Sequence, residues 1–136
     1  MPRVKLFDEK EVLNKAMCLF WKQGYAATSI QDLVSHLGIS RASLYDTYGN
    51  KEQLFNKAFE QYRKSNIEGL KQFFTSHSEV KEGFRKLFQL AVEEAINDTE
   101  KKGCFVVNTT TELIPNDVAL IHILKENKAS VEQLFF

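Results

Sequence analysis

Residues 28–51, with the sequence TSIQDLVSHLGISRASLYDTYGNK, constrain the fold of this chain more than any other stretch. Its first half places apolar side chains at i, i+3, i+4 and i+7, which predicts one amphipathic helix. Thr28 and Gln31 have the spacing of a capping box, so we expect the helix to begin there. Gly38 favours a left-handed turn, and Ser40 is placed to cap a second helix. The stretch therefore predicts two short helices joined by a tight turn.

The second helix of this pair is expected to have two different faces. Leu44 and Tyr48 are four residues apart, so they share the inner face. The positions left without a core to fill are Arg41, Ala42, Ser43, Tyr45 and Thr47. An arginine, hydroxyl groups, a small residue and a tyrosine suit the edges of base pairs and their phosphates. Asp46 departs from this pattern, because its carboxylate repels phosphate unless it accepts from a cytosine amino group or pairs with Arg41.

These residues resemble those of the tetracycline-repressor (TetR) family of transcriptional regulators. The matching features run in order: Gly24-Tyr25, Thr28-Ser29, Leu37-Gly38-Ile39-Ser40, Leu44-Tyr45, Lys51 and Leu54-Phe55. A helix-turn-helix pattern alone is common, but this ordered set is specific and covers about the first third of the chain. Beyond it, the resemblance rests on the helix pattern and on Gly103-Cys104-Phe105.

The resemblance implies an all-α fold with an N-terminal three-helix, helix-turn-helix DNA-binding domain over residues 1–51. The helix that closes this domain is expected to run on from about 51 to 74. Residues 52–136 are expected to form part of a helical domain for effector binding and dimerisation, without the C-terminal dimerisation helices. Because the chain ends at Leu134-Phe135-Phe136 with no capping residue, we expect a truncated chain that binds its operator weakly and is monomeric or aberrantly associated.

The resemblance also implies which residues contact DNA. Groove and phosphate contacts are expected from the second helix, and Lys51 matches a phosphate-anchoring lysine. The start of the first helix of the pair offers backbone N–H groups to a phosphate, and Gln31 lies where a base edge is within reach. The full predicted set is Thr28, Ser29, Gln31, Ser40, Arg41, Ala42, Ser43, Tyr45, Thr47, Tyr48 and Lys51.

Apolar periodicity predicts helices on both sides of this motif. Asp8 and Glu11 cap a first helix, whose buried stripe is Val12, Ala16, Leu19 and Phe20. Trp21 and Tyr25 are expected to pack against the helix pair. Asn50 and Gln53 cap the long helix, whose apolar face is Leu54, Phe55, Ala58, Phe59, Tyr62, Leu70, Phe73 and Phe74.

The second half predicts three more helices. The first has a regular apolar stripe, namely Val80, Phe84, Leu87, Phe88, Ala91, Val92 and Ala95. Residues 97–103 form a charged loop. Residues 104–114 are rich in β-branched side chains, which favour a strand, but no partner strand exists and the resemblance implies a helix. A last helix begins at Asn116 or Asp117, with Leu120, Leu124, Val131 and Leu134 inward.

An effector cavity is the open question of the second half. Aromatic and polar side chains could line an apolar pocket between helices, and ordinary core packing is the alternative for each of them. The predicted set is Phe84, Phe88, Phe105, Asn108, Thr109, Thr111, Glu112 and His122. The resemblance implies a small-molecule effector that shifts the spacing of the two DNA-reading heads.

Other chemistries find little support. No serine has a strand-turn-helix context, and no Gly-rich phosphate loop is present, so we expect no enzyme and no cofactor. His36, His77 and His122 fall on three predicted elements without metal-ligand spacing, so no metal is expected. Cys18 and Cys104 lie in apolar neighbourhoods and are expected to be buried free thiols.

Net charge and hydropathy limit where the protein is expected to act in the cell. The 18 basic and 18 acidic residues cancel, although residues 1–51 carry net +2 and the remainder −2. No signal peptide and no apolar run long enough to cross a membrane is recognisable, so we expect a cytoplasmic, nucleoid-associated protein.

The resulting hypothesis is a sequence-specific transcriptional regulator, a repressor that acts as a homodimer on palindromic double-stranded DNA and is released by its effector. Two rivals are an enzyme on a helical scaffold and a helical protein-interaction module without DNA binding. The lack of a catalytic constellation argues against the first. Salt dependence separates the second, because phosphate binding weakens steeply with salt.

Overall fold

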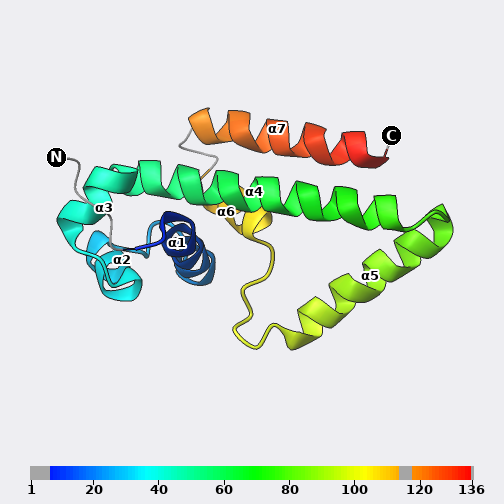
Figure 1. Ribbon diagram of the computed structural model, residues 1–136, viewed down its shortest axis with the longest axis horizontal. Helices are drawn as coiled ribbons and strands as arrows, with labels where there is room; N and C mark the ends of the chain where they lie inside the picture. Colours follow the sequence, from blue (N-terminus) through cyan, green and yellow to red (C-terminus); the bar gives the residue numbers. More distant parts are fainter. Residues whose placement is uncertain (1–6, 114–117, 136) are drawn as a thin grey trace. The chain divides into compact units, whose positions relative to one another are not determined.

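The computed structural model of the protein describes residues 7–113 and 118–135. Over these residues all regular structure is helical, which confirms the predicted class. The helices are α1 (Glu9–Gln23), α2 (Ile30–Leu37), α3 (Arg41–Tyr48), α4 (Lys51–Ser76), α5 (Val80–Asn97), α6 (Phe105–Leu113) and α7 (Val118–Phe135) (Figure 1). The chain forms two compact units, Met1–Tyr62 and Arg63–Phe136, and the boundary falls within α4.

Helix α1 begins and ends where the sequence predicts. The Asp8 carboxylate accepts from the backbone N–H groups of Lys10 and Glu11, and the Gly24 N–H donates to the Phe20 carbonyl. Its four buried side chains are those of the predicted stripe, Val12, Ala16, Leu19 and Phe20. Helix α1 therefore presents one continuous apolar face to the rest of its unit.

Helix α2 has a different cap from the predicted one. Ser29, not Thr28, is the N-cap: its hydroxyl oxygen accepts from the Asp32 N–H at 3.0 Å. The Asp32 carboxylate in turn accepts from the Ser29 N–H at 3.0 Å, which completes the capping box. The predicted Thr28–Gln31 box is wrong by one residue, because Ser-x-x-Asp and Thr-x-x-Gln overlap in the sequence and the shorter carboxylate closes the box.

The turn and α3 follow the prediction closely. Gly38 is left-handed, with φ 68° and ψ 26°, and its N–H donates to the Val34 carbonyl. Only glycine enters this conformation at little cost. Ser40 caps α3 by accepting from the Ser43 N–H. Leu44 and Tyr48 are buried, at 0% and 4% exposure, so the inner face of α3 is the one expected.

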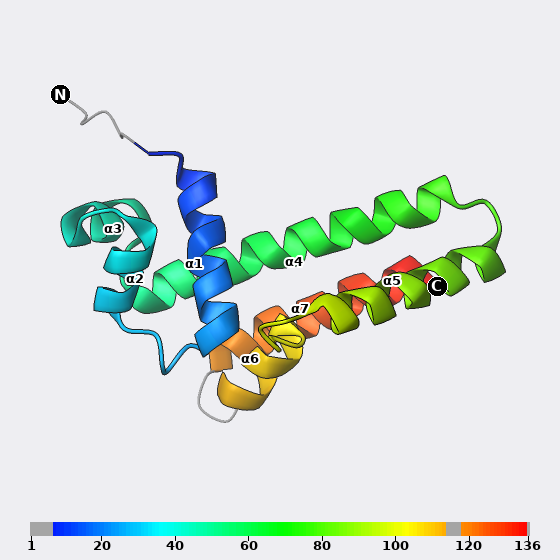
Figure 2. The same cartoon turned by 90° about the horizontal axis from the view of Figure 1, so that it is seen from below.

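The first part of α4 closes the core of the N-terminal unit. Asn50 and Gln53 cap it reciprocally, with backbone-to-side-chain hydrogen bonds of 2.9 and 2.8 Å. Helix α1 crosses this part of α4 (Figure 2), and the Phe20 and Phe55 rings meet edge-on with centroids 5.1 Å apart. The buried side chains of this part of α4 are Leu54, Phe55, Ala58 and Phe59, as predicted.

The C-terminal unit has a smaller core and an aromatic cluster. Its buried apolar residues are Ile67, Phe105, Leu120 and Leu124. Phe74 of α4, Phe84 of α5 and Phe135 of α7 pack together, with ring centroids 5.4 to 5.5 Å apart. Phe135, predicted to lie in an uncovered apolar end, has two ring partners and is still 39% exposed. Residues 104–113 are helical, which resolves the ambiguity with a strand.

Two predictions of burial are wrong. Helix α5 forms as expected, but its apolar stripe is largely exposed: Val80 is 69%, Phe88 68% and Val92 57% accessible. Cys18 and Cys104 are free but exposed, not buried. Periodicity identifies the apolar face of a helix, yet burial also requires another element on that face.

Candidate nucleic-acid interface

The outward face of α3 has an ordered layout. At 100° per residue, Ala42 and Asp46 lie opposite the buried Leu44 and Tyr48. Arg41 and Tyr45 flank them on one side, and Ser43 and Thr47 on the other. The middle of this face is therefore a methyl group and a carboxylate, with a cation and a ring beside them.

Hydroxyl groups cluster at the start of α3. Ser40 Oγ accepts from the Ser43 N–H at 3.1 Å and donates to Ser43 Oγ at 2.9 Å. Both residues are thereby held at the N-terminus of the helix, where the dipole favours an anion. The Ser43 hydroxyl keeps its own proton for an outside acceptor.

Arg41 is held by the preceding helix and not by Asp46. Its Nη2 donates to Gln31 Oε1 at 3.3 Å, and Gln31 Nε2 donates to Ser35 Oγ at 3.4 Å. Gln31 is therefore outside the cap of α2, contrary to the predicted box. No local pattern in the sequence signals this connection, because ten residues separate the two partners.

Negative charge also occupies this surface. The Asp32 carboxylate sits on the N-terminus of α2, and hydrogen bonds from the Ser29 backbone and side chain lower its pKa. The carboxylate accepts from the Ser29 N–H, which is a backbone group that was expected to bind a phosphate. Asp46, exposed on α3, adds a second carboxylate.

Lys51 opens α4 beside an aromatic ring. Its Nζ lies 4.2 Å from the centroid of the Tyr25 ring, a distance typical of a cation–π contact. Tyr25 itself packs on Phe20 and Phe55, so this ring belongs to the core of α1 and α4. Tyr25 was predicted to pack against the α2–α3 pair, and its ring contacts with Phe20 and Phe55 join it to α1 and α4. The ring fixes the place from which the ammonium group can reach an anion.

Two residues of the predicted DNA-binding set point inward. Thr28 is fully buried, and its hydroxyl donates to the Gly24 carbonyl at 2.7 Å. Its N–H is also occupied, by the Tyr25 carbonyl at 3.2 Å. Tyr48 is 4% exposed. Both were predicted to contact DNA, but their side chains lie on the inner side of their elements, as the spacing of Leu44 and Tyr48 already indicated for Tyr48.

Tyr48 has a structural partner that sequence analysis did not find. Its hydroxyl donates to the Glu9 backbone carbonyl at 2.7 Å, which ties the end of α3 to the first turn of α1. Burial, with the Glu9 and Asp8 carboxylates nearby, raises the pKa of Tyr48 to about 12. Thirty-nine residues separate the partners, so no local pattern signals this bond.

The predicted effector residues do not share one surface. Phe105 and Thr109 are buried on one side of α6, at 2% and 3% exposure. The exposed members of the set are Phe88, Asn108, Thr111, Glu112 and His122. Thr111 donates to the Val107 carbonyl, and His122 faces solvent beside Glu126. Phe84 is half-buried. The prediction that all eight residues line a common cavity is therefore wrong, because two of them are buried and five are exposed to solvent.

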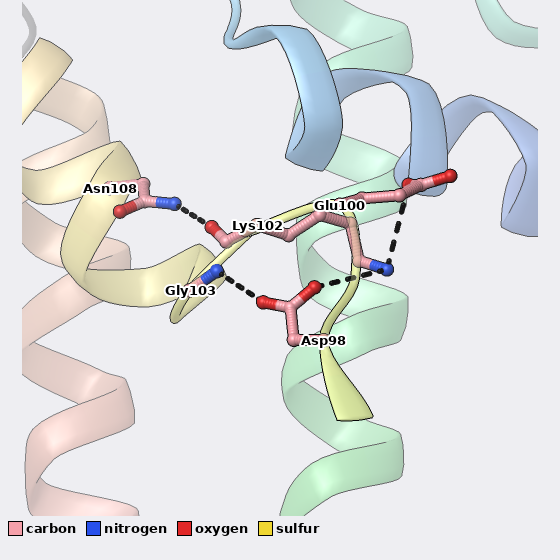
Figure 3. A network of polar contacts seen from close by, with 5 residues as sticks. All are labelled: Asp98, Glu100, Lys102, Gly103 and Asn108. Carbon is pink, nitrogen blue, oxygen red and sulfur yellow. Dashed lines mark hydrogen bonds and ion pairs between the residues drawn. The ribbon is translucent and has the colours of Figure 1, made fainter. Parts of the chain in front are cut away.

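Asn108 holds a loop instead of lining a cavity. Its Nδ2 donates to the Lys102 carbonyl at 2.6 Å (Figure 3). The Lys102 ammonium group pairs with Asp98 at 3.9 Å and Glu100 at 3.7 Å. The Gly103 N–H donates to Asp98, and this bond, with the N–H groups of Lys102 and Lys101, lowers the pKa of the Asp98 carboxyl. These contacts fix the segment before α6.

Among the described residues there is neither a cluster of metal ligands nor a helix that could span a membrane. Within residues 7–113 and 118–135, no group of three or more His, Cys, Asp or Glu side chains could hold a metal ion. In the same part of the chain, no helix has both the length and the apolarity needed to cross a bilayer.

One buried group on α7 was not anticipated: Asn127 Oδ1 has no hydrogen-bond partner among the described residues.

Comparisons with known proteins agree on one family. The family described as "Bacterial regulatory proteins, tetR family" matches residues 12–58. The chain is 39% identical over 137 residues to YezE, an uncharacterized HTH-type transcriptional regulator of Bacillus subtilis (strain 168), covering all of this chain and 70% of YezE. It is 33% identical over 132 residues to the HTH-type transcriptional repressor ComR of Escherichia coli (strain K12). That match covers 96% of this chain and 63% of ComR.

A solved structure extends the likeness to three dimensions. It is a cysteine mutant of the TetR family transcriptional regulator CifR, complexed with 26-bp double-strand operator DNA. The TM-score is 0.81 at 28% sequence identity, and the match covers 98% of this chain and 70% of the CifR chain. Since the match covers 98% of this chain, the shared arrangement includes α3 and the helices that support it.

Proposed function

The chain belongs to the tetR family of bacterial regulatory proteins, and on this premise we propose that α3 is the recognition helix by which it reads one operator sequence. Its function is that of a DNA-binding transcriptional regulator. The observation that supports the role of α3 most strongly is its outward face, which exposes Arg41, Ala42 and Tyr45 at the end of a capped turn. A helix of this width and polarity fits the major groove.

The proposed contacts divide by chemistry. Arg41 reads a base edge, Ala42 permits close approach of the helix, and Tyr45, 44% exposed, contacts a base or phosphate. Phosphates are bound by hydroxyl groups and by the ammonium of Lys51. These phosphate ligands are Ser43, Thr47 and Lys51. The hydroxyl protons of Ser40 and Ser29 are already donated to Ser43 Oγ and to the Asp32 carboxylate, so these two residues would have to release them before binding a phosphate. Thr28 and Tyr48 take no part, because the structure buries both.

We also propose how the protein regulates transcription. Names of similar proteins include repressors, and a repressor is the simplest role for this chain. Two copies would read a palindrome, with recognition helices in successive major grooves about 34 Å apart. A small-molecule effector bound by the unit Arg63–Phe136 would favour a conformation in which that spacing is lost. Such a regulator acts at the nucleoid.

Selection of bound duplexes from a random-sequence pool tests this function. We expect enrichment of one sequence with palindromic halves, bound with an affinity that falls steeply as salt rises. The slope of log affinity against log salt counts the phosphates neutralised. Failure to enrich any sequence, or binding that ignores salt, would contradict the proposal and favour a protein-interaction module.

A further inference from the structure

The outer surface of the helix-turn-helix carries a hydrogen-bonded chain of three side chains. Arg41, the first residue of α3, donates from Nη2 to Gln31 Oε1 at 3.3 Å. Gln31 donates from Nε2 to Ser35 Oγ at 3.4 Å, one turn farther along α2. All three side chains are exposed. These three hydrogen-bonded side chains therefore link α2 and α3 on the side of the motif that faces away from the core.

The chemistry of the three groups fixes the orientation of the Gln31 amide. A guanidinium group has donors only, so the amide must turn its oxygen towards Arg41. This leaves the amide nitrogen for Ser35, whose hydroxyl oxygen can accept. The opposite orientation would set an N–H against the Arg41 N–H groups. Gln31 is thus held at both ends of its amide.

A glutamine that reads adenine uses its amide oxygen and nitrogen together on one base. In this structure each atom of the Gln31 amide already has one protein partner. One N–H and one oxygen lone pair remain, but a movement of the amide towards a base would disturb its bond to Arg41. Arg41 has given up one of its five N–H donors and keeps four. This bond favours one direction of the guanidinium group before any base arrives, which lowers the ordering that binding must impose.

We propose that Gln31 is a positioning residue, which orients the Arg41 guanidinium for one base pair and does not itself read a base. The inference rests on the proposed DNA binding and adds a division of labour between α2 and α3. Ser35 completes the device by holding the far end of the Gln31 amide. Sequence specificity at the Arg41 base pair then depends on a residue of the preceding helix.

The test uses the duplex that the wild-type chain enriches from a random pool, with each base pair substituted in turn. Gln31→Met keeps the length of the side chain and removes both hydrogen bonds. We expect it to lose about tenfold in preference, at the same base pair at which Arg41→Ala loses preference. The double variant should be no less selective than Arg41→Ala alone, because the two residues act as a unit. Gln72→Met is the matched control and should change nothing, since Gln72 is another exposed helical glutamine and donates to Glu68 four residues earlier.

Two other results of this test would overturn the inference. Loss of preference at a different base pair, adding to that of Arg41→Ala, would show that Gln31 reads its own base and would overturn the inference. Unchanged preference at every base pair, with or without a lower unfolding temperature, would leave the bond structural only and would also overturn it. If wild-type protein enriches no duplex, the proposed function fails first, and this result is distinct from either of those two.

Discussion

Arg41 and Lys51 represent two kinds of contact that the surface can make. Arg41 extends from the first turn of α3, and Lys51 rests over the Tyr25 ring at the start of α4. We expect Arg41→Ala to weaken specific binding by about 1 to 3 kcal/mol and to relax preference at one base pair of each half-site. Lys51→Ala should weaken all sequences alike and reduce the salt slope by about one.

Titrations of both variants against the enriched duplex and a scrambled one, at several salt concentrations, measure these effects. Lys71→Ala, an exposed lysine in the second half of α4, serves as the control for loss of one positive charge. Equal losses on specific and scrambled DNA for Arg41→Ala would identify Arg41 as a phosphate contact.

Tyr48 gives stability a defined dependence on alkaline pH. An unfolded tyrosine ionises near pH 10, whereas burial raises the pKa of Tyr48 to about 12. A raised acid pKa means that the folded state holds the proton longer, so this contribution is intact below about pH 10 and is lost as pH rises towards 12. Tyr48→Phe should cost about 1 kcal/mol at neutral pH through the lost bond to Glu9.

Urea denaturation of both proteins across this pH range provides the measurement. The stability difference between wild type and Tyr48→Phe should shrink between about pH 10 and 12, since phenylalanine cannot ionise. Tyr45→Phe, at an exposed position on the same helix, is the control. A constant difference across the range would mean that the Tyr48 hydroxyl is not protected by folding.

Single residues also show how far local patterns extend. Caps and stripes such as Ser40 with Leu44, or Asp8 with Val12, depend on neighbours within four residues and were predictable. The Arg41–Gln31 and Tyr48–Glu9 bonds join residues distant in sequence, and no spacing rule announces them. Thr28 illustrates a closer failure, because two overlapping box patterns compete and the choice between them depends on which hydroxyl is buried.

Two glycines, one at the end of α2 and one within α4, allow the cost of backbone conformation to be compared. Gly38 ends α2 at φ +68° with no atom within 4 Å of a would-be Cβ, so Gly38→Ala should cost about 1 kcal/mol from backbone strain alone. Gly69, within α4, also has open space but no unusual backbone conformation. Gly69→Ala should therefore stabilise the protein by about 0.5 to 1 kcal/mol.

Free energies of unfolding from urea titration decide this pair. The two substitutions add the same methyl group, so opposite signs isolate the conformation of the backbone as the cause. Stabilisation by Gly38→Ala would contradict the left-handed assignment of the turn.

The elements were predicted better than their surroundings. Helix starts at Asp8, Ser40 and Asn50 follow from side chains that cap them, and residues 105–113 form a helix despite their β-branched content. This β-prone segment has no strand to pair with among residues 7–113 and 118–135, so tertiary context outweighs its propensity. The apolar stripe of α5, by contrast, marked a face that remains exposed.

In the C-terminal unit, the exposed fraction of each phenylalanine side chain predicts how much that residue contributes to stability. Phe105 is 2% exposed and Phe88 68% exposed, each on a helix. Phe105→Ala should destabilise the protein by about 3 to 5 kcal/mol, because it leaves a cavity. Phe88→Ala, the matched substitution, should change stability by no more than about 0.5 kcal/mol. Comparable losses in urea denaturation would mean that the α5 face is covered in solution.

Trp21 gives this molecule a built-in optical reporter. It is the one tryptophan of the sequence, and its ring packs edge-on against Tyr62 with centroids 5.4 Å apart, inside the unit Met1–Tyr62. Tryptophan emission should therefore follow the unfolding of that unit, whereas far-ultraviolet circular dichroism follows the helices of both. Coincident transitions would reveal one cooperative system, and separate ones would assign a melting temperature to each unit without any label.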